Sequence, residues 1–167
     1  MIRRSTINLN YANINKLQIL TEIFEEYNRL VNVMINHLWD NNIFKGSFVS
    51  NIPDIDTWLS ARMIQCISKQ ALAIVKSQRK RKKKTKPQFN RYVMELDSRF
   101  TTISQDINSF DIWIRLSSVG NNIKLQLPSK KHCHFNKFIK DGWKLKKSLR
   151  LRSTDKGIFA DLYFEKE

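Results

Sequence analysis

The side chains in this sequence best suited to chemistry are lysines and arginines, which gather in two clusters. The first, Lys76–Arg91, contains the stretch SQRKRKKKTK, in which seven of ten residues are basic. The second, Lys130–Arg152, interleaves basic residues with Phe135, Phe138 and Trp143. Ammonium and guanidinium groups neutralise phosphates, and exposed aromatic rings stack on unpaired bases. The two clusters therefore predict contact with nucleic acid.

Other roles for the two clusters stay open. The rings in Lys130–Arg152 would serve equally well to anchor a loop to the core. The run in Lys76–Arg91 is also typical of a solvated linker or of a nuclear-import signal. A helical pattern precedes this run and alternating strands follow it. A disordered tail therefore does not fit its position.

The charge of the chain is unevenly distributed. The formal net charge is +15, but residues 1–60 carry only −1 and residues 61–167 carry +16. Hydrophobic residues make up 41% of the chain and aromatic residues 11%, which is typical of a globular protein rather than a disordered one. A positive excess this large and this local indicates a strongly anionic partner.

Side chains for catalysis or metal binding are sparse. Asp97, Asp106 and Asp111 form no recognisable metal motif and are interpreted as turn residues and charge balance. The triplet His132–His134 offers soft ligands, but a zinc site takes four, and the other thiol, Cys66, falls in a predicted helix. Phosphate loops, HExxH motifs and nucleophile elbows are also missing from the sequence. We expect no catalytic residue, metal or cofactor in this chain.

The sequence also predicts where the protein resides. Its two cysteines form no CxxC pair, which favours reduced thiols over a disulfide framework. The first residues, MIRRSTINLN, do not resemble a signal peptide. No apolar run approaches the roughly 20 residues that a membrane span requires. We expect a cytoplasmic protein with no membrane partner.

The elements that must position the basic clusters follow from hydrophobic periodicity. Alternating apolar residues predict a short strand between Arg4 and Tyr11. Steps of three and four predict one helix over residues 13–41 and a second that starts near Asp54–Thr57 and continues through Val75. After Pro87 the period changes to two, and the predicted strands are Tyr92–Leu96, Phe100–Ile103, Phe110–Leu116, a partner strand from Ile123 that Pro128 ends, and a hairpin of Ser148–Arg152 with Ile158–Phe164.

This order of elements predicts an α+β fold. The lone first strand needs partners, and only the later strands offer them. The economical arrangement is one antiparallel β-barrel or sandwich with a two-helix hairpin inserted after the first strand. Residues 1–12 and 87–167 would form the barrel, and residues 13–86 the helical lobe.

A resemblance to a known family is carried by four segments: ARMIQCISKQALAIVKSQRKRKK, FDIWIRLSS, LPSKKHCHFNKFIKDGWKLKKSLRLR and FADLYFEKE. They resemble the N-terminal portion of the TnpB proteins, which are transposon-encoded RNA-guided DNA endonucleases related to the compact type V CRISPR effectors. The resemblance extends over nearly the whole chain and rests on a distributed pattern. It implies an OB-like wedge β-barrel, interrupted by a helical recognition lobe, that holds guide RNA and the short motif flanking the target DNA.

The resemblance and the charge pattern together give the candidate nucleic-acid-binding residues. Gln65 and Lys69, on the second predicted helix, are candidates for contact with the flanking motif. In the resemblance, Arg79–Lys86 joins the recognition helices to the barrel, and Lys130–Arg152 lies on its RNA-facing loops. The candidates in the two clusters are Lys76, Arg79, Arg81, Lys82, Lys83, Lys84, Lys86, Arg91, Lys130, Lys131, His132, His134, Lys137, Lys144, Lys146, Lys147, Arg150 and Arg152.

The sequence departs from the family at its end. Family members continue into a RuvC-like nuclease with three metal-binding carboxylates and a zinc ribbon, whereas this sequence stops at Glu167, where that nuclease would begin. Divalent metal and zinc are therefore expected only in that missing part, and this chain alone is not expected to cleave DNA. A truncated or split module is the leading hypothesis, with guide-like RNA, target DNA and possibly a separate nuclease chain as partners. The alternatives are a freestanding binder or repressor without cleavage activity, and a decayed mobile-element remnant.

Overall fold

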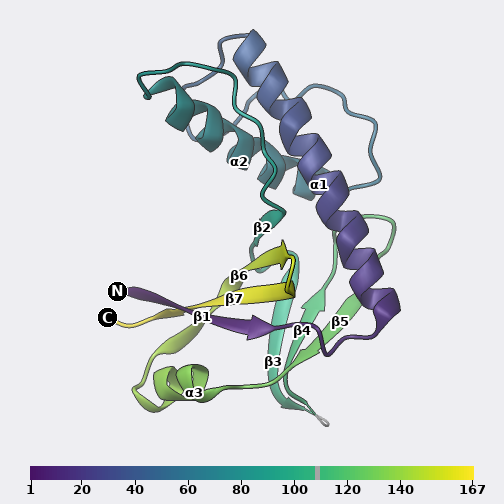
Figure 1. The fold of residues 1–167 in the computed structure, drawn as a ribbon, viewed down its shortest axis with the longest axis vertical. Helices are drawn as coiled ribbons and strands as arrows, with labels where there is room; N and C mark the ends of the chain where they lie inside the picture. The colour runs from purple at the N-terminus through teal and green to yellow at the C-terminus, as the bar shows by residue number, and fades with distance from the viewer. Residues whose placement is uncertain (108–109) are drawn as a thin grey trace. The chain divides into compact units, whose positions relative to one another are not determined.

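The structure, a computed structural model, describes residues 1–107 and 110–167. In these residues it contains three helices and seven strands (Figure 1). They divide into two compact units, named here the sheet unit (residues 1–24 and 92–167) and the helical unit (residues 25–91). The first helix starts in the sheet unit and ends in the helical unit.

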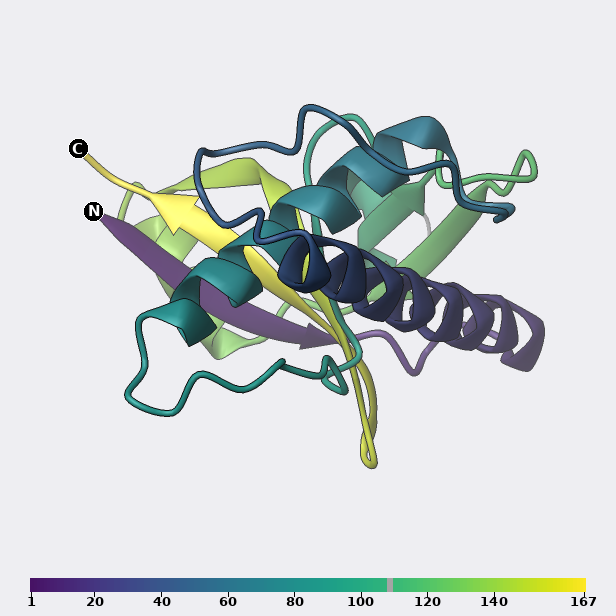
Figure 2. The same ribbon diagram turned by 90° about the horizontal axis from the view of Figure 1, so that it is seen from above.

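The first and last strands of the chain lie side by side in a four-stranded antiparallel sheet. The strand order is β1-β7-β6-β2, and Thr6 lies opposite Asp161. In Figures 1 and 2 the two termini lie at the same end of this sheet, and the Met1 amino group donates to the Lys166 carbonyl at 2.8 Å. The expectation that the first strand pairs with a later one is confirmed. The strands are β1 (Ile2–Asn8), β2 (Val93–Leu96), β6 (Lys144–Thr154) and β7 (Gly157–Glu165).

A second antiparallel sheet has the order β3-β4-β5. Its strands are β3 (Thr101–Ile107), β4 (Phe110–Leu116) and β5 (Leu125–Ser129). The alternation of FDIWIRL is confirmed, since Ile112, Ile114 and Leu116 are fully buried. The sequence predicts that Pro128 ends its strand, but Pro128 lies inside β5. Proline is tolerated there because β5 is an edge strand and needs no N–H donor on its open side.

The strands of the described residues form two sheets rather than one closed barrel. Side-chain bonds join the sheets: Thr101 Oγ1 donates to the Lys147 carbonyl at 3.2 Å, and Ser129 Oγ donates to the Asn8 carbonyl at 2.6 Å. The α+β class and the antiparallel strands are confirmed, whereas barrel closure is not. Backbone hydrogen bonds do not pair β1 with β5 or β2 with β3. In the described residues each sheet therefore has two unpaired edge strands.

The two long helices are α1 (Ile14–Asp40) and α2 (Ala61–Arg79). The bounds of α1 agree with the predicted helix over residues 13–41. The predicted start of α2 near Asp54–Thr57 is too early, because Ser60 is the N-cap and its Oγ accepts the Met63 N–H at 3.2 Å. Thr57 instead fixes the preceding loop, since its Oγ1 donates to Glu26 Oε1 at 2.8 Å. None of the described helices is long and apolar enough to cross a membrane.

The sequence does not predict the short helix α3 (Cys133–Lys140). Its N-cap position is taken by His132 rather than by serine, threonine, aspartate or asparagine, which are the usual N-cap residues. β6 also begins four residues earlier than the predicted Ser148, at Lys144. Its pairing with β7 is irregular between Leu145 and Leu149, which interrupts the alternation that a strand prediction depends on.

Candidate nucleic-acid interface

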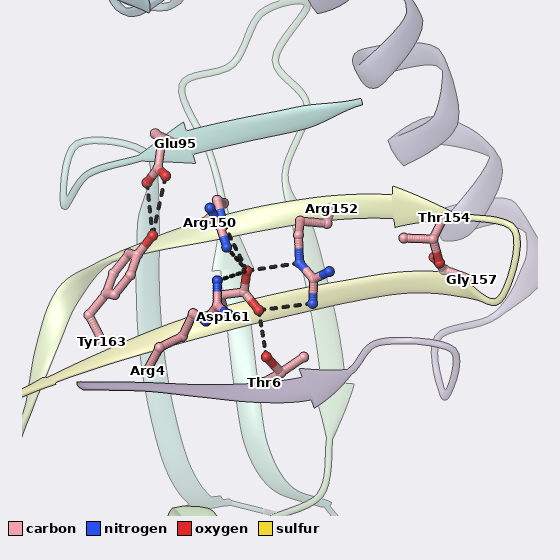
Figure 3. A network of polar contacts seen from close by, with 9 residues as sticks. All are labelled: Arg4, Thr6, Glu95, Arg150, Arg152, Thr154, Gly157, Asp161 and Tyr163. Atoms are coloured by element: carbon pink, nitrogen blue, oxygen red, sulfur yellow. Dashed lines mark hydrogen bonds and ion pairs between the residues drawn. The ribbon is translucent and has the colours of Figure 1, made fainter. Parts of the chain in front are cut away.

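A buried carboxylate organises one face of the β1-β7-β6-β2 sheet (Figure 3). Asp161 on β7 has no exposed surface. Arg150 Nε donates to its Oδ2 at 2.8 Å, and Arg152 Nη2 donates to its Oδ1 at 3.1 Å. Thr6 Oγ1 donates to the same Oδ1 at 2.6 Å, and Arg4 Nη1 lies 4.0 Å from Oδ2. Two strands, β1 and β6, thus supply the partners of one carboxylate on β7.

This arrangement keeps the carboxylate charged and leaves the face positive. Burial alone would raise the pKa of Asp161, but hydrogen bonds from Thr6, Arg150 and Arg152 outweigh it and hold the pKa below its ordinary 3.8. A guanidinium has five N–H donors, and Asp161 engages only some of them. The side chains of Arg4, Arg150 and Arg152 keep 55%, 25% and 31% of their surface exposed. The arginines are therefore fixed in direction and can still donate to a further anion.

Two aromatic rings extend this face. The Tyr163 hydroxyl lies 3.2 Å and 3.3 Å from the two carboxylate oxygens of Glu95 on β2. Desolvation raises the pKa of Glu95, and the hydrogen bond from Tyr163 offsets only part of this. Phe159 lies below the Arg152 guanidinium, with 5.8 Å between Cζ and the ring centroid. Arginine networks beside aromatic rings suit contact with nucleotides, because rings stack on bases while guanidinium groups bind phosphates.

Most predicted residues of the second cluster lie on the surface of the sheet unit. The exposed ones are Lys130, His134, Lys137, Lys144 and Lys147. Two others are partly engaged, since Lys131 Nζ lies 2.8 Å from Asp106 and Lys146 Nζ lies 3.6 Å from Glu165. Both ion pairs are partly exposed to water, where such pairs are weak. The exposed lysines outnumber these pairs, so this surface remains strongly positive.

His132 has a structural role at the start of α3. Its Nδ1 accepts the Phe135 N–H at 3.3 Å, and its Nε2 lies 2.6 Å from the Thr6 carbonyl oxygen. Because a carbonyl only accepts, Nε2 carries the proton and both ring nitrogens are used. The ring therefore caps α3 and ties it to β1, which is a role that the sequence does not predict.

The three rings of the second cluster anchor α3 to the sheet. Phe135 is fully buried and lies edge-on to Phe164, with centroids 5.2 Å apart. Phe138 stacks on Phe164 at 5.0 Å and meets Trp143 at 5.3 Å. Of the two roles that the sequence leaves open, the structure thus gives these rings contacts with the core. Base stacking at this cluster has no support from their positions.

In the helical unit, Arg79 and Lys76 hold loops in place. The Arg79 guanidinium lies 4.0 Å from the Trp39 ring centroid and 5.0 Å from that of Phe44, and it donates to Asn42 Oδ1 at 3.0 Å. Lys76 Nζ donates to the carbonyl of Gly46 at 2.7 Å. Both side chains secure the segment after α1. Gln65 and Lys69 are exposed on α2.

The basic run itself is an exposed loop after α2. The side chains of residues 81–86 are exposed, as is Arg91. Gln78 Nε2 lies 3.4 Å from the Lys83 carbonyl and 3.3 Å from Thr85 Oγ1, and Lys86 pairs with Asp40 at 2.8 Å. These contacts hold the second half of the loop, at residues 83–86. Within the described residues, the charged groups of positions 81–84 form no ion pair.

Sequence reasoning finds Arg150 and Arg152 but misses Arg4, Phe159 and Tyr163 on the same face. The available signal is the alternation in FADLYFE, which puts Phe159, Asp161 and Tyr163 on one side of β7. The contribution of β1 depends on pairing between strands that are far apart in the chain, so no local pattern reveals it.

Two further findings bear on this interface, one on metal-ligand groups and one on similarity to known proteins. In residues 1–107 and 110–167, His, Cys, Asp and Glu side chains form no group of three that is able to hold a metal ion. No protein-family model matches the chain. Comparison with curated proteins likewise gives no significant match. The likeness to TnpB proteins is therefore a hypothesis based on the residues themselves.

Proposed function

We propose that this chain is a nucleic-acid-binding module that holds a guide-like RNA and its DNA target, as the N-terminal part of a TnpB-like RNA-guided endonuclease. The observation that carries the proposal is the +16 net charge of residues 61–167, together with the exposure of most lysines in the two clusters. Such an excess repels itself in the folded protein and is relieved by a polyanion. In this proposal the chain acts in the cytoplasm and does not cleave DNA alone.

The two units have different parts in this proposal. The two sheets of the sheet unit correspond to the wedge barrel of the family, and α1 and α2 to its recognition lobe. The arginine face around Asp161 and the lysines of residues 130–152 bind RNA backbone, since fixed guanidinium groups suit phosphates. Gln65 and Lys69 are proposed contacts of the motif that flanks the target. A separate nuclease chain would supply cleavage.

Salt dependence is the physical signature of this binding. If five to eight phosphates are contacted, the logarithm of the affinity falls with the logarithm of the salt concentration with a slope of roughly −0.7 per contact on single strands and −0.9 on duplex. A solvated basic surface without a nucleic-acid ligand would give weak binding with a shallow slope.

The experiment compares three proteins in fluorescence-anisotropy titrations of single-stranded RNA over a range of salt. The first is the unaltered chain, and the second carries Arg81→Gln, Lys82→Gln and Lys83→Gln. Arg79 is left intact because it packs on Trp39. The third is a charge-matched control, with Arg3→Gln, Lys45→Gln and Lys156→Gln at exposed positions outside both clusters.

The proposal expects the loop variant to bind less tightly and its slope to lose roughly 0.7 for each phosphate contact removed. The control should keep the slope of the unaltered chain. Equal slopes for all three proteins would make the loop a solvated linker. Absence of RNA binding by the unaltered chain at low salt would exclude the proposed function.

A further inference from the structure

Three aromatic rings that the basic clusters do not include gather on the sheet unit. Tyr11, in the segment between β1 and α1, lies 5.7 Å from Phe110 on β4, measured between ring centroids. Phe110 in turn meets Trp113 edge-on at 5.8 Å. Tyr11 is 48% exposed, and Phe110 and Trp113 are half-buried. This cluster, named here the aromatic platform, is therefore open to solvent.

Positive groups surround the aromatic platform. Lys130 Nζ lies 5.4 Å from the centroid of the Tyr11 ring, and Lys16 Nζ lies 5.9 Å from that of Trp113. Lys16 also donates to the Gln126 carbonyl at 2.7 Å, which fixes its position. Arg115 is exposed and, two residues after Trp113 on β4, projects from the same side of the strand. Asp111, also on that side of β4, accepts the backbone N–H of Lys131.

Core packing alone does not explain this arrangement. Rings that serve the core of this unit are enclosed, as are Phe135 and Phe164, which have no exposed surface. Tyr11 and its neighbours instead present ring surface to water beside the ammonium groups of Lys16 and Lys130. A ligand that complements such a surface needs flat apolar faces and negative charges a few ångströms apart. Unpaired nucleotides have both.

We propose that the aromatic platform stacks unpaired bases of a single-stranded nucleic acid while Lys16 and Lys130 bind the neighbouring phosphates. This inference rests on the proposed function for the kind of ligand, and it adds a site and a preference for unpaired strands. Bases in a duplex are already stacked and present only their edges in the grooves, so rings gain little from them. The platform therefore separates single strands from duplex, which the lysine clusters alone do not.

The test uses the full chain with Tyr11→Ala, Tyr11→Phe and, as a matched exposed aromatic elsewhere, Phe48→Ala. The probes are oligouridine, the same oligomer with abasic sugars in place of uridines, and an RNA duplex of equal length. Tyr11→Ala should weaken oligouridine binding about tenfold, as loss of one stacked base does, and leave abasic and duplex binding unchanged. Tyr11→Phe and Phe48→Ala should bind all probes as the unaltered chain does.

A second measurement avoids any dependence on the folding of a variant. Oligouridine carrying 5-iodouridine is crosslinked to the unaltered chain by light, and the attached residue is identified by mass spectrometry. Crosslinks at Tyr11, Phe110 or Trp113 support the inference.

Two results would overturn the inference, and they differ in what they leave standing. If the unaltered chain binds RNA but Tyr11→Ala does not change oligouridine binding and crosslinks form only elsewhere, the platform is wrong and the proposed function survives. If the unaltered chain binds neither oligouridine nor duplex, the proposed function fails and the platform with it.

Discussion

Asp161 links the fold of the sheet unit to the proposed nucleic-acid face. It holds Arg150 and Arg152 in fixed directions and is bonded by Thr6 on the first strand. The arginines that the sequence assigns to nucleic acid thus have an internal partner as well. Because a guanidinium has more donors than one carboxylate can accept, the two roles are compatible.

Replacing Asp161 by alanine should destabilise the sheet unit by about 3 kcal/mol. This is the lower end of the cost of breaking a buried ion pair, since Arg150 and Arg152 keep partial access to water. Urea denaturation followed by circular dichroism measures the change. Asp155→Ala, at an exposed position in the same hairpin, is the control and should stay within about 0.5 kcal/mol. Equal stability of both variants would show that the carboxylate contributes nothing.

The same residue should make stability depend on pH on the acid side. The pKa of Asp161 in the folded protein lies below its ordinary 3.8, so folding releases a proton that the unfolded chain still binds in this range. Its contribution is fully present above pH 3.8 and is lost as the pH falls through the lowered value. The difference in unfolding free energy between the unaltered chain and Asp161→Asn should therefore be constant above pH 3.8 and shrink below it. A difference that grows as the pH falls would contradict a lowered pKa of Asp161 in the folded protein.

The limits of sequence reasoning at this scale follow from tertiary partners. Charge density correctly identifies most lysines of the two clusters as surface residues, because most of them remain exposed in the described residues. It gives the same weight to Arg79, which packs on Trp39, and to His132, which caps α3. Trp39 lies 40 residues from Arg79 in the chain, and Thr6, which the His132 ring also contacts, lies 126 residues from His132. No local pattern contains that information.

At the scale of elements, periodicity predicts the long helices and most strands because one face of each is buried. It fails for α3, in which Phe135 alone is buried, and for the start of β6, where the pairing is irregular. The hairpin of β6 and β7 is predicted, and the structure explains why its turn needs a glycine. Gly157 has a φ of +123°, and Asn10 lies against its open side.

Gly157→Ala should destabilise the sheet unit by about 2–4 kcal/mol, since the new methyl group meets the Asn10 side chain and the backbone is strained. Asn10 Oδ1 accepts the Ile158 N–H at 3.0 Å, so displacing Asn10 also breaks a bond that fixes the hairpin. Gly142→Ala is the control: its φ is +79°, but nothing lies within 4 Å of an added methyl group. It should cost only the strain, about 1–2 kcal/mol. Equal losses in thermal unfolding would contradict the role given to Asn10.

At the scale of the whole molecule, topology is the most predictable property. A lone first strand needs partners, and that requirement places the ends of the chain in one sheet, with α1 and α2 inserted between β1 and β2. Barrel closure is not predictable in the same way, since it depends on strand tilt and register along every edge. In the described residues the backbone hydrogen bonds between strands form two separate sheets.

Ile7→Ala tests whether the first strand is integral to the fold. Ile7 is 1% exposed and lies opposite Ala160 on β7, so removing its side chain should cost about 2–4 kcal/mol. Ile2→Ala on the same strand is the control, because Ile2 is 60% exposed, and it should change stability by less than about 0.5 kcal/mol. Similar unfolding midpoints for Ile7→Ala and the unaltered chain would mean that β1 contributes little.

The central claim is that this protein holds a particular RNA. The direct measurement is to isolate the chain from its native host, sequence the RNA that remains bound after a salt wash, and compare it with total RNA. The proposed function predicts strong enrichment of one structured transcript, and a lower recovery of it from the variant with Arg81→Gln, Lys82→Gln and Lys83→Gln. Recovery of no RNA, or of RNAs in proportion to their abundance, would contradict it.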